Sequence, residues 1–409
     1  MRSAIMRRRA KTMSNDSTMT ERSEPRRPPP PIPLTILTGF LGAGKTTLLN
    51  RLLASPELAD TLVLINEFGE VGIDHLLVEN VEGDMIVMSS GCICCSIRGD
   101  LVAALEDALR KLDNGRIRPF RRVVLETTGL ADPAPILHTI MSHPYLALRY
   151  RLDGVVSLVD AVNGAATLDA HEEAVKQAAV ADRLIITKTD LPEGASRLEA
   201  LDQRLARLNP AARRLIAATG EASPAALLDC GLYDASGKIP QVAKWLNDEA
   251  VAAAHEAHHH HHDHHHHDHD HHHGHAHQDV NRHDAHIRAF CVTSDAPLSP
   301  QAFDMFVEIL RQAHGPHLLR VKGIVGLTDD RERPVAVHGV QHVFHPPHRL
   351  AAWPDADRRT RLVFIVKDLD PSFVEKLYAA VAGIPAPDTP DAAALQDNPL
   401  APKNAGLLG

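Results

Sequence analysis

Residues 39–46 read GFLGAGKT, and this stretch decides the fold expected for the first half of the chain. It fits the pattern G-x-x-x-x-G-K-[ST], in which glycines let the backbone wrap around phosphate groups. An apolar run, Leu34–Leu37, comes directly before it, and a helix-forming stretch, Lys45–Ala54, comes directly after it. Because the motif needs a strand before it and a helix after it, the sequence predicts a phosphate-binding loop within an α/β domain.

Further short apolar runs recur from this loop to about Thr219. They are Leu62–Asn66, Met85–Ser89, Arg122–Glu126, Gly154–Val159, Leu184–Thr187 and Leu215–Ala218. Helix-like stretches follow most of them, among them Leu101–Leu112, Glu172–Ala181 and Leu198–Leu208. Strands that are apolar throughout and alternate with helices predict a mostly parallel sheet covered on both faces.

The length of 409 residues predicts more than one domain. We expect a disordered basic, proline-rich N-terminus at 1–33, a P-loop domain at 34–229, a histidine-rich linker at 230–286, a small α+β domain at 287–383 and a loose tail at 384–409. The small domain is predicted from Ile287–Val292, Pro300–Ala313, Leu319–Leu327, Pro334–His345, Arg361–Val366 and Pro371–Ala380. The arginines at the start also allow a mitochondrial targeting segment, and Met13 is an alternative start.

Composition excludes several classes of function. A formal net charge of -9 and an aromatic content of 4% argue against nucleic-acid binding. No run of 18 apolar residues occurs, so no membrane-spanning helix is expected. Five cysteines in so long a chain do not form a secreted disulfide framework, which favours reduced thiols in the cytoplasm.

The P-loop residues have distinct expected roles. Lys45 reaches the β- and γ-phosphate oxygens, and Thr46 holds Mg²⁺. The surrounding backbone binds phosphate through Gly39, Gly42, Ala43, Gly44 and Thr47. These roles make Lys45 and Thr46 both binding and catalytic candidates.

Two further motifs indicate which nucleotide binds. The strand Arg122–Glu126 ends in an acid that suits Mg²⁺, which makes Glu126 a third catalytic candidate, and Gly129 follows three residues later, where it passes close to the γ-phosphate. The sequence Thr187-Lys188-Thr189-Asp190 follows another strand, where a carboxylate accepts both donors of guanine. Adenine offers no such pair, so Lys188 and Asp190 favour GTP over ATP.

Three cysteines, Cys92, Cys94 and Cys95, follow the apolar run Met85–Ser89. Three thiolates converging on one soft cation leave a fourth tetrahedral position open, which suits an ion that is passed on. Glu67 or, less favoured, His75 supplies an extra ligand. The alternatives are small buried side chains or a local disulfide.

Of the 28 histidines, 18 lie between His255 and His286. Neutral imidazoles on such a low-complexity segment gather Zn²⁺, Ni²⁺, Co²⁺ or Cu²⁺ weakly and exchange them quickly. The alternative is a solvated segment with incidental metal affinity.

These motifs, in this order, resemble the CobW-like family of P-loop GTPases that serve as metal chaperones. The resemblance covers about residues 34–220, and more weakly the C-terminal domain, through Arg320-Val-Lys322-Gly323 and Gln341-x-Val343-x-His345. It implies slow GTP hydrolysis coupled to metal delivery, with Cys92, Cys94 and Cys95 as the metal cysteines. Thr187 stands where many GTPases have Asn, which implies weaker guanine contacts.

The expected function is therefore transfer of a divalent metal to client apo-metalloproteins, driven by a GTP/GDP cycle with Mg²⁺. Zn²⁺ is the favoured metal, and Co²⁺ is the alternative. One alternative is cobalt supply to cobalamin synthesis or to a nitrile hydratase-type enzyme. Another is a passive metal buffer with a vestigial nucleotide site, which predicts metal uptake indifferent to GTP. A homo-oligomer is left open.

Overall fold

The computed structural model describes residues 29–68, 85–90, 97–228 and 286–384. The chain divides into the units Met1–Pro30 and Pro31–Gly409, and every element below belongs to the second. Five regions with sequence-based predictions lie outside the described residues: 1–28 of the N-terminus, His75, the cysteine segment, 230–285 of the histidine-rich linker and 385–409 of the tail.

Within the described residues, the first sheet has seven strands in the order β3-β2-β4-β1-β5-β6-β7. Every neighbouring pair in it is parallel. The strands are β1 (Ile32–Gly39), β2 (Thr61–Phe68), β3 (Met85–Ser90), β4 (Arg122–Glu126), β5 (Tyr150–Asp160), β6 (Arg183–Thr187) and β7 (Arg213–Ile216). The predicted parallel α/β fold is confirmed.

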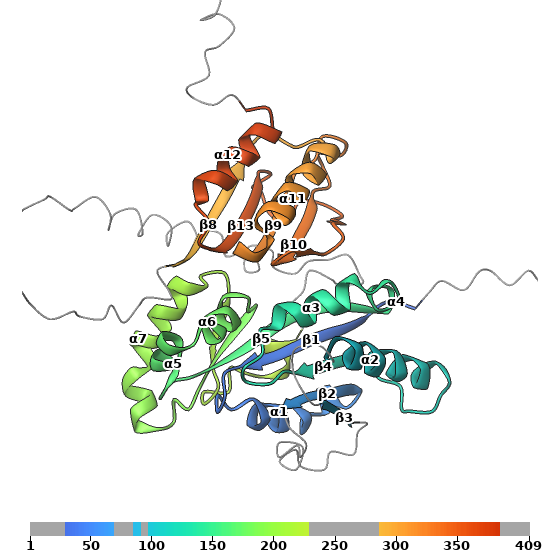
Figure 1. The fold of residues 1–409 in the computed structure, drawn as a ribbon, viewed down its shortest axis with the longest axis vertical. Helices are drawn as coiled ribbons and strands as arrows, with labels where there is room; N and C mark the ends of the chain where they lie inside the picture. The colour runs from blue at the N-terminus through green and yellow to red at the C-terminus, as the bar shows by residue number, and fades with distance from the viewer. Residues whose placement is uncertain (1–28, 69–84, 91–96, 229–285, 385–409) are drawn as a thin grey trace, which may run out of the picture. The chain divides into compact units, whose positions relative to one another are not determined.

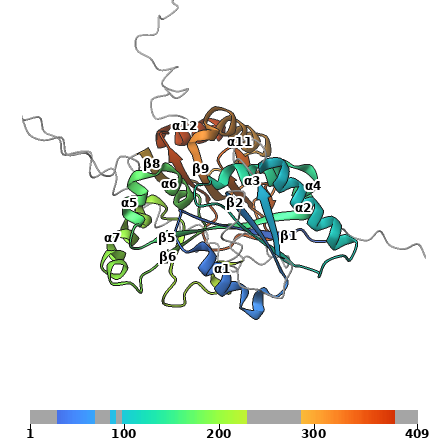
Figure 2. The ribbon, with the colours of Figure 1, turned by 60° about the horizontal axis from the view of Figure 1, so that its bottom comes forward.

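Helices cover both faces of this sheet (Figure 1). They are α1 (Lys45–Leu53), η1 (Pro56–Leu58), α2 (Ile97–Asp113), α3 (Pro133–Ser142), α4 (Pro144–Arg149), α5 (Gly164–Ala170), α6 (Glu172–Ala179), α7 (Pro192–Leu208) and α8 (Pro224–Leu227). Leucines of α1 pack on one face, against alternate residues of the central strands. The opposite face packs against α2, α3, α6 and α7, and Figure 2 turns the α1 side toward the viewer.

Helix α3 was not expected from the periodicity of the sequence. Its start carries the ordinary signals, because Pro133 occupies the first turn and the carboxylate of Asp132 accepts a hydrogen bond from Ala134 N at 2.9 Å. Its sequence is apolar on nearly all sides, which removes the amphipathic pattern by which a surface helix is recognised.

The second sheet is antiparallel, with the path β11-β10-β9-β13-β8 and with β12 paired to β10. Its elements are β8 (Ile287–Ser294), α11 (Pro300–His314), η4 (Gly315–His317), β9 (Leu318–Val325), β10 (Val335–Val340), β11 (Val343–Phe344), β12 (His348–Arg349), β13 (Thr360–Lys367) and α12 (Pro371–Val381). The predicted run Pro334–His345 is thus two strands, since Gln341 turns the chain back with a φ of 52°.

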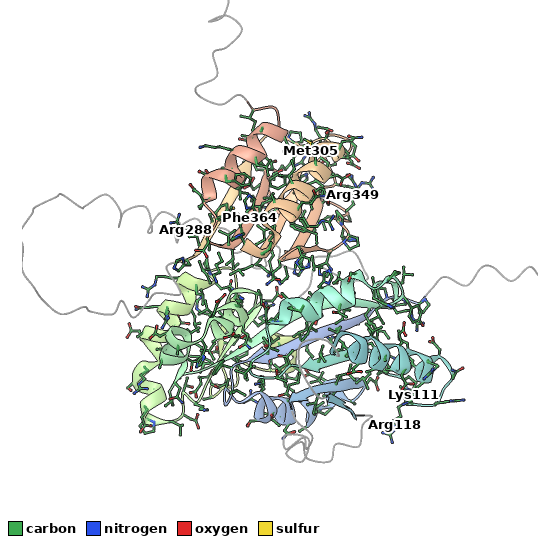
Figure 3. All side chains as sticks on the ribbon, in the orientation of Figure 1. Lys111, Arg118, Arg288, Met305, Arg349 and Phe364 are labelled. Carbon is green, nitrogen blue, oxygen red and sulfur yellow. The ribbon has the colours of Figure 1, made fainter. Side chains whose placement is uncertain are left out.

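The two faces of the second sheet have different neighbours. One face packs against α11 and α12, and there Phe364 of β13 stacks on Phe290 of β8 with ring centroids 5.2 Å apart (Figure 3). The other face contributes Leu319, Ile324 and Ala336 to the same hydrophobic cluster as the helices of the first sheet. The two sheets therefore share one core.

Candidate nucleotide-binding site

The P-loop joins β1 to α1 at the carboxyl edge of the parallel sheet. Gly44 precedes the first helical residue with a φ of 93°, a conformation that L side chains rarely adopt. Ala43 N donates to Phe40 O at 3.1 Å and so closes the turn that contains the exposed Gly42. The start of α1 therefore faces a compact loop, which is the arrangement that binds phosphate.

Lys45 folds back over this loop. Its Nζ donates to Gly39 O at 2.9 Å and to Phe40 O at 3.3 Å. The ammonium group is therefore held at the mouth of the loop before any phosphate arrives. Thr47, the remaining predicted phosphate contact, is exposed in the first turn of α1.

Thr46, in the first turn of α1, lies beside Glu126 at the end of β4. Glu126 ends β4, which pairs with β1 so that Leu37 lies opposite Glu126. Thr46 Oγ1 lies 3.5 Å from Glu126 Oε1, and Glu126 is only 3% exposed. A hydroxyl and a carboxylate are the hard oxygen donors that Mg²⁺ prefers, so the residues present fit the predicted metal.

Gly129 borders the P-loop directly. A Cβ atom at this position would lie 2.6 Å from the backbone nitrogen of Leu41, closer than real Cβ contacts come. The chain between Glu126 and α3 can therefore approach the P-loop only because residue 129 has no side chain. The structure thus brings Lys45, Thr46, Glu126 and Gly129 to one edge.

The Thr187-Lys188-Thr189-Asp190 segment contacts the other end of the P-loop. Thr187 Oγ1 donates to Ala43 O at 2.8 Å, so the threonine ties the end of β6 to the P-loop. Asp190 lies three residues beyond Thr187 and is exposed. The position at which many GTPases have Asn is therefore occupied by a side chain that still makes a polar bond to this loop.

Lys188 points toward β5. Its Nζ donates to Asp160 Oδ2 at 2.6 Å, and its backbone is left-handed with a φ of 58°. Burial acts to raise the pKa of Asp160, but hydrogen bonds from Lys188, Val162 N and Asn163 hold it below its usual value. The ion pair therefore fixes the lysine stem beside the expected base site. Asp160 was not singled out from the sequence, although it ends an apolar strand as Glu126 does.

Glu67, the predicted extra metal ligand, lies in β2. Its backbone pairs with Ser89 of β3, so it occupies the carboxyl end of the strand beside the one that leads to the cysteines. The described residues contain no cluster of three or more His, Cys, Asp or Glu side chains able to hold a metal ion. In the same part of the chain, no helix is long and apolar enough to cross a membrane.

Comparison with known proteins decides the family. Residues 33–216 match the model of the CobW/HypB/UreG nucleotide-binding domain, and residues 287–382 match the cobalamin synthesis protein CobW C-terminal domain. The zinc chaperone YjiA of Escherichia coli is 34% identical over 355 residues, which cover 87% of this chain and 99% of that protein. The chain belongs to the CobW family.

Other relatives agree with this assignment. The zinc-regulated GTPase metalloprotein activator 1 of Schizosaccharomyces pombe is 37% identical over 186 residues, which cover 44% of each chain. The crystal structure of Zn(II)-bound YjiA GTPase from E. coli superposes with a TM-score of 0.59 at 30% identity, covering 86% of this chain and 99% of that one. The fold of this CobW-family protein is thus shared with YjiA over both sheets.

A buried ionic cluster joins the two sheets of this CobW-family protein. Asp182, directly before β6, accepts from Arg320 Nη2 and Lys322 Nζ of β9, each at 2.5 Å. All three side chains are at most 2% exposed. Burial alone would raise the pKa of Asp182, but the two cations hold it well below its usual range.

The sequence contains a signal for this cluster, although above it served only to support the family resemblance. In Arg320-Val-Lys322-Gly323 the two cations are two residues apart in an apolar strand, so they lie on one face of the sheet. Two buried cations on one face require a counter-charge. The partner, Asp182, could not be identified from spacing because it lies 138 residues away from Arg320.

Proposed function

We propose that this CobW-family protein is a GTP-hydrolysing metallochaperone that transfers a divalent metal, with zinc as the favoured cargo, to client metalloproteins. One observation carries the proposal: a P-loop with Lys45 and the Thr46–Glu126 pair in place lies in a chain that matches a zinc chaperone over 99% of that chaperone's length. Cytoplasmic location and GTP as the nucleotide belong to the same proposal.

The residues at the carboxyl edge of the first sheet have separate roles in nucleotide binding and hydrolysis. Lys45 binds the β- and γ-phosphate oxygens, and the backbone N–H groups of the P-loop bind the remaining phosphate oxygens. Thr46 and Glu126 hold Mg²⁺, which when bound neutralises charge that develops on the phosphates. Gly129 brings its backbone close to the γ-phosphate, so this segment distinguishes GTP from GDP.

The cargo metal is proposed to bind Cys92, Cys94 and Cys95, with Glu67 as a further ligand. The register of β2 and β3 supports this set, because Glu67 lies opposite Ser89, three residues before the first cysteine. Parallel strands end at the same edge, so β3 ends at the edge that carries the P-loop. We therefore expect a nucleotide-dependent change at that edge to alter the affinity of the proposed metal site.

Metal titration tests the proposal. We expect one tight ion at the thiolates, with proton release and with an affinity that differs between the apo, GDP and Mg-GTP-analogue states. Competition of Zn²⁺ and of Co²⁺ against chelators measures this difference for each metal. Tighter retention of Co²⁺ would favour the cobalt alternative, and affinities equal in all three states would favour the passive buffer.

Two variants separate the two metal regions. Cys94→Ser should abolish the tight site and its dependence on GTP, while Cys291→Ser in β8 should leave both unchanged. Deleting residues 257–277 should lower the metal stoichiometry, since it removes weak imidazole ligands that protonate near pH 5, without changing the tight site. A deletion that removes the GTP-linked site would contradict the thiolate assignment.

Asp190 is proposed to select guanine. Asp190→Asn replaces one acceptor with a donor, so preference should move from GTP toward XTP by about tenfold or more. Competition binding of GTP, XTP and ATP measures the change, with Asp202→Asn on α7 as the control. If the variant prefers GTP as strongly as the wild type does, Asp190 lies outside the base site.

A further inference from the structure

Gln177 is a buried polar side chain that belongs to none of the motifs above. It lies on α6 and is 1% exposed. Its Nε2 donates to Gly129 O at 3.2 Å and to Ala131 O at 2.9 Å. Both amide protons therefore form hydrogen bonds to the backbone of one short segment, which joins Glu126 to α3.

The two ends of this segment are fixed by other bonds. Thr127 N donates to Leu37 O at 3.0 Å, and Thr127 Oγ1 donates to Thr38 Oγ1 at 2.9 Å, so the segment leaves β4 tied to β1. At the far end Asp132 caps α3. Gln177 acts on the residues between these ends, where Gly129 touches the P-loop.

Packing around Gln177 is incomplete. The side chain borders a cavity of about 100 Å³ whose other walls include Phe40 to Ala43 of the P-loop and Asp160. Gln177 therefore contacts both this cavity beside the P-loop and the Gly129 segment. The two hydrogen bonds of Gln177 hold that segment in place, because a trans peptide is planar, so fixing the Gly129 carbonyl also fixes the N–H of Leu130.

Loss of these bonds would leave the buried carbonyl of Gly129 without the donor that now satisfies it, which is costly. A glutamine meets this need without adding charge next to the triphosphate. A glutamine on the surface would not have to satisfy buried backbone carbonyls.

We propose that Gln177 is a positioning residue for the nucleotide site: its amide clamps the Gly129 segment against the P-loop in the arrangement that reads the γ-phosphate. This inference rests on the proposed GTPase function. It assigns to α6 a part in distinguishing GTP from GDP, although α6 contains none of the nucleotide motifs.

Gln177→Met tests the clamp, because methionine has nearly the same length and has no N–H group. We expect GDP affinity to stay within about twofold of the wild type, affinity for a non-hydrolysable GTP analogue to fall about tenfold, and single-turnover hydrolysis to slow by at least that factor. Gln203→Met on the exposed face of α7 is the matched control and should behave like the wild type.

Gln177→Asn is a second test that remains usable if Gln177→Met does not fold. It keeps a buried amide but is one methylene shorter, so it cannot reach both carbonyls, and it should show the same selective loss for the GTP analogue. If either variant binds GDP normally and retains the wild-type ratio of GTP-analogue to GDP affinity, even with a lower melting temperature, the inference is wrong. Failure of the wild type itself to bind GTP would instead overturn the proposed function.

Discussion

Lys45→Ala should lower single-turnover GTP hydrolysis at least about 100-fold, since one charged group aimed at developing phosphate charge is worth two to three orders of magnitude in rate. The structure gives the reason for so large an effect. The ammonium group is already held at the mouth of the P-loop by Gly39 O and Phe40 O, so its position is set before phosphate binds. Hydrolysis is measured by phosphate release with Mg²⁺ present.

Lys111→Ala is the matched control for this variant. Lys111 lies in the last turn of α2, pairs only locally with Asp107, and is far from the P-loop in the chain (Figure 3). Its removal should leave the rate unchanged. Full hydrolysis in the Lys45 variant would show that the nucleotide site lies elsewhere or that the activity belongs to a contaminant.

The second large effect concerns stability. Asp182→Asn should lower the free energy of unfolding by about 3–5 kcal/mol, because it leaves Arg320 and Lys322 buried without their carboxylate. Urea unfolding followed by circular dichroism measures the loss. Asp107→Asn on α2 is the control, since its two ion pairs are solvent-exposed, and it should hardly change the midpoint.

The same cluster gives a direction for the pH dependence of stability. The pKa of Asp182 is lower in the folded protein than in the unfolded chain, so its stabilising contribution is complete above about pH 4 and is lost as the pH falls through the folded-state value. The wild type should therefore lose more stability on acidification than Asp182→Asn does. Equal acid sensitivity of the two proteins would show that Asp182 is not ionised in the cluster.

Much of the fold could be predicted because its strands are apolar on both faces and are separated by glycine or polar residues. The strand Arg122–Glu126 was placed at its observed bounds, since an arginine and an acid mark its ends. Helix α3 was missed because its apolar sequence lacks an amphipathic period. The pattern explains the difference: a short apolar run with polar ends marks a strand, whereas a helix that is apolar on nearly all sides has no amphipathic period to mark it.

In the nucleotide site, too, some residues could be predicted from the sequence and others could not. Lys45 and Thr46 were predicted from the spacing of the P-loop motif, and Glu126 and Gly129 from the end of an apolar strand; the structure places all four at one edge of the sheet. Gln177 was not, since its role comes from α6 packing across the edge of the sheet onto a segment 48 residues earlier in the chain. A glutamine on an otherwise alanine-rich buried helix face gives no indication of which backbone it will contact.

The shared core has a consequence for how this protein can be rearranged by recombination. A gene fusion that joined the first sheet to an unrelated C-terminal domain would leave Asp182 in an apolar surface without its cationic partners. The reverse exchange would bury Arg320 and Lys322 against a surface without a carboxylate. The two halves therefore cannot be inherited as interchangeable modules, and they have to change together or remain as a pair.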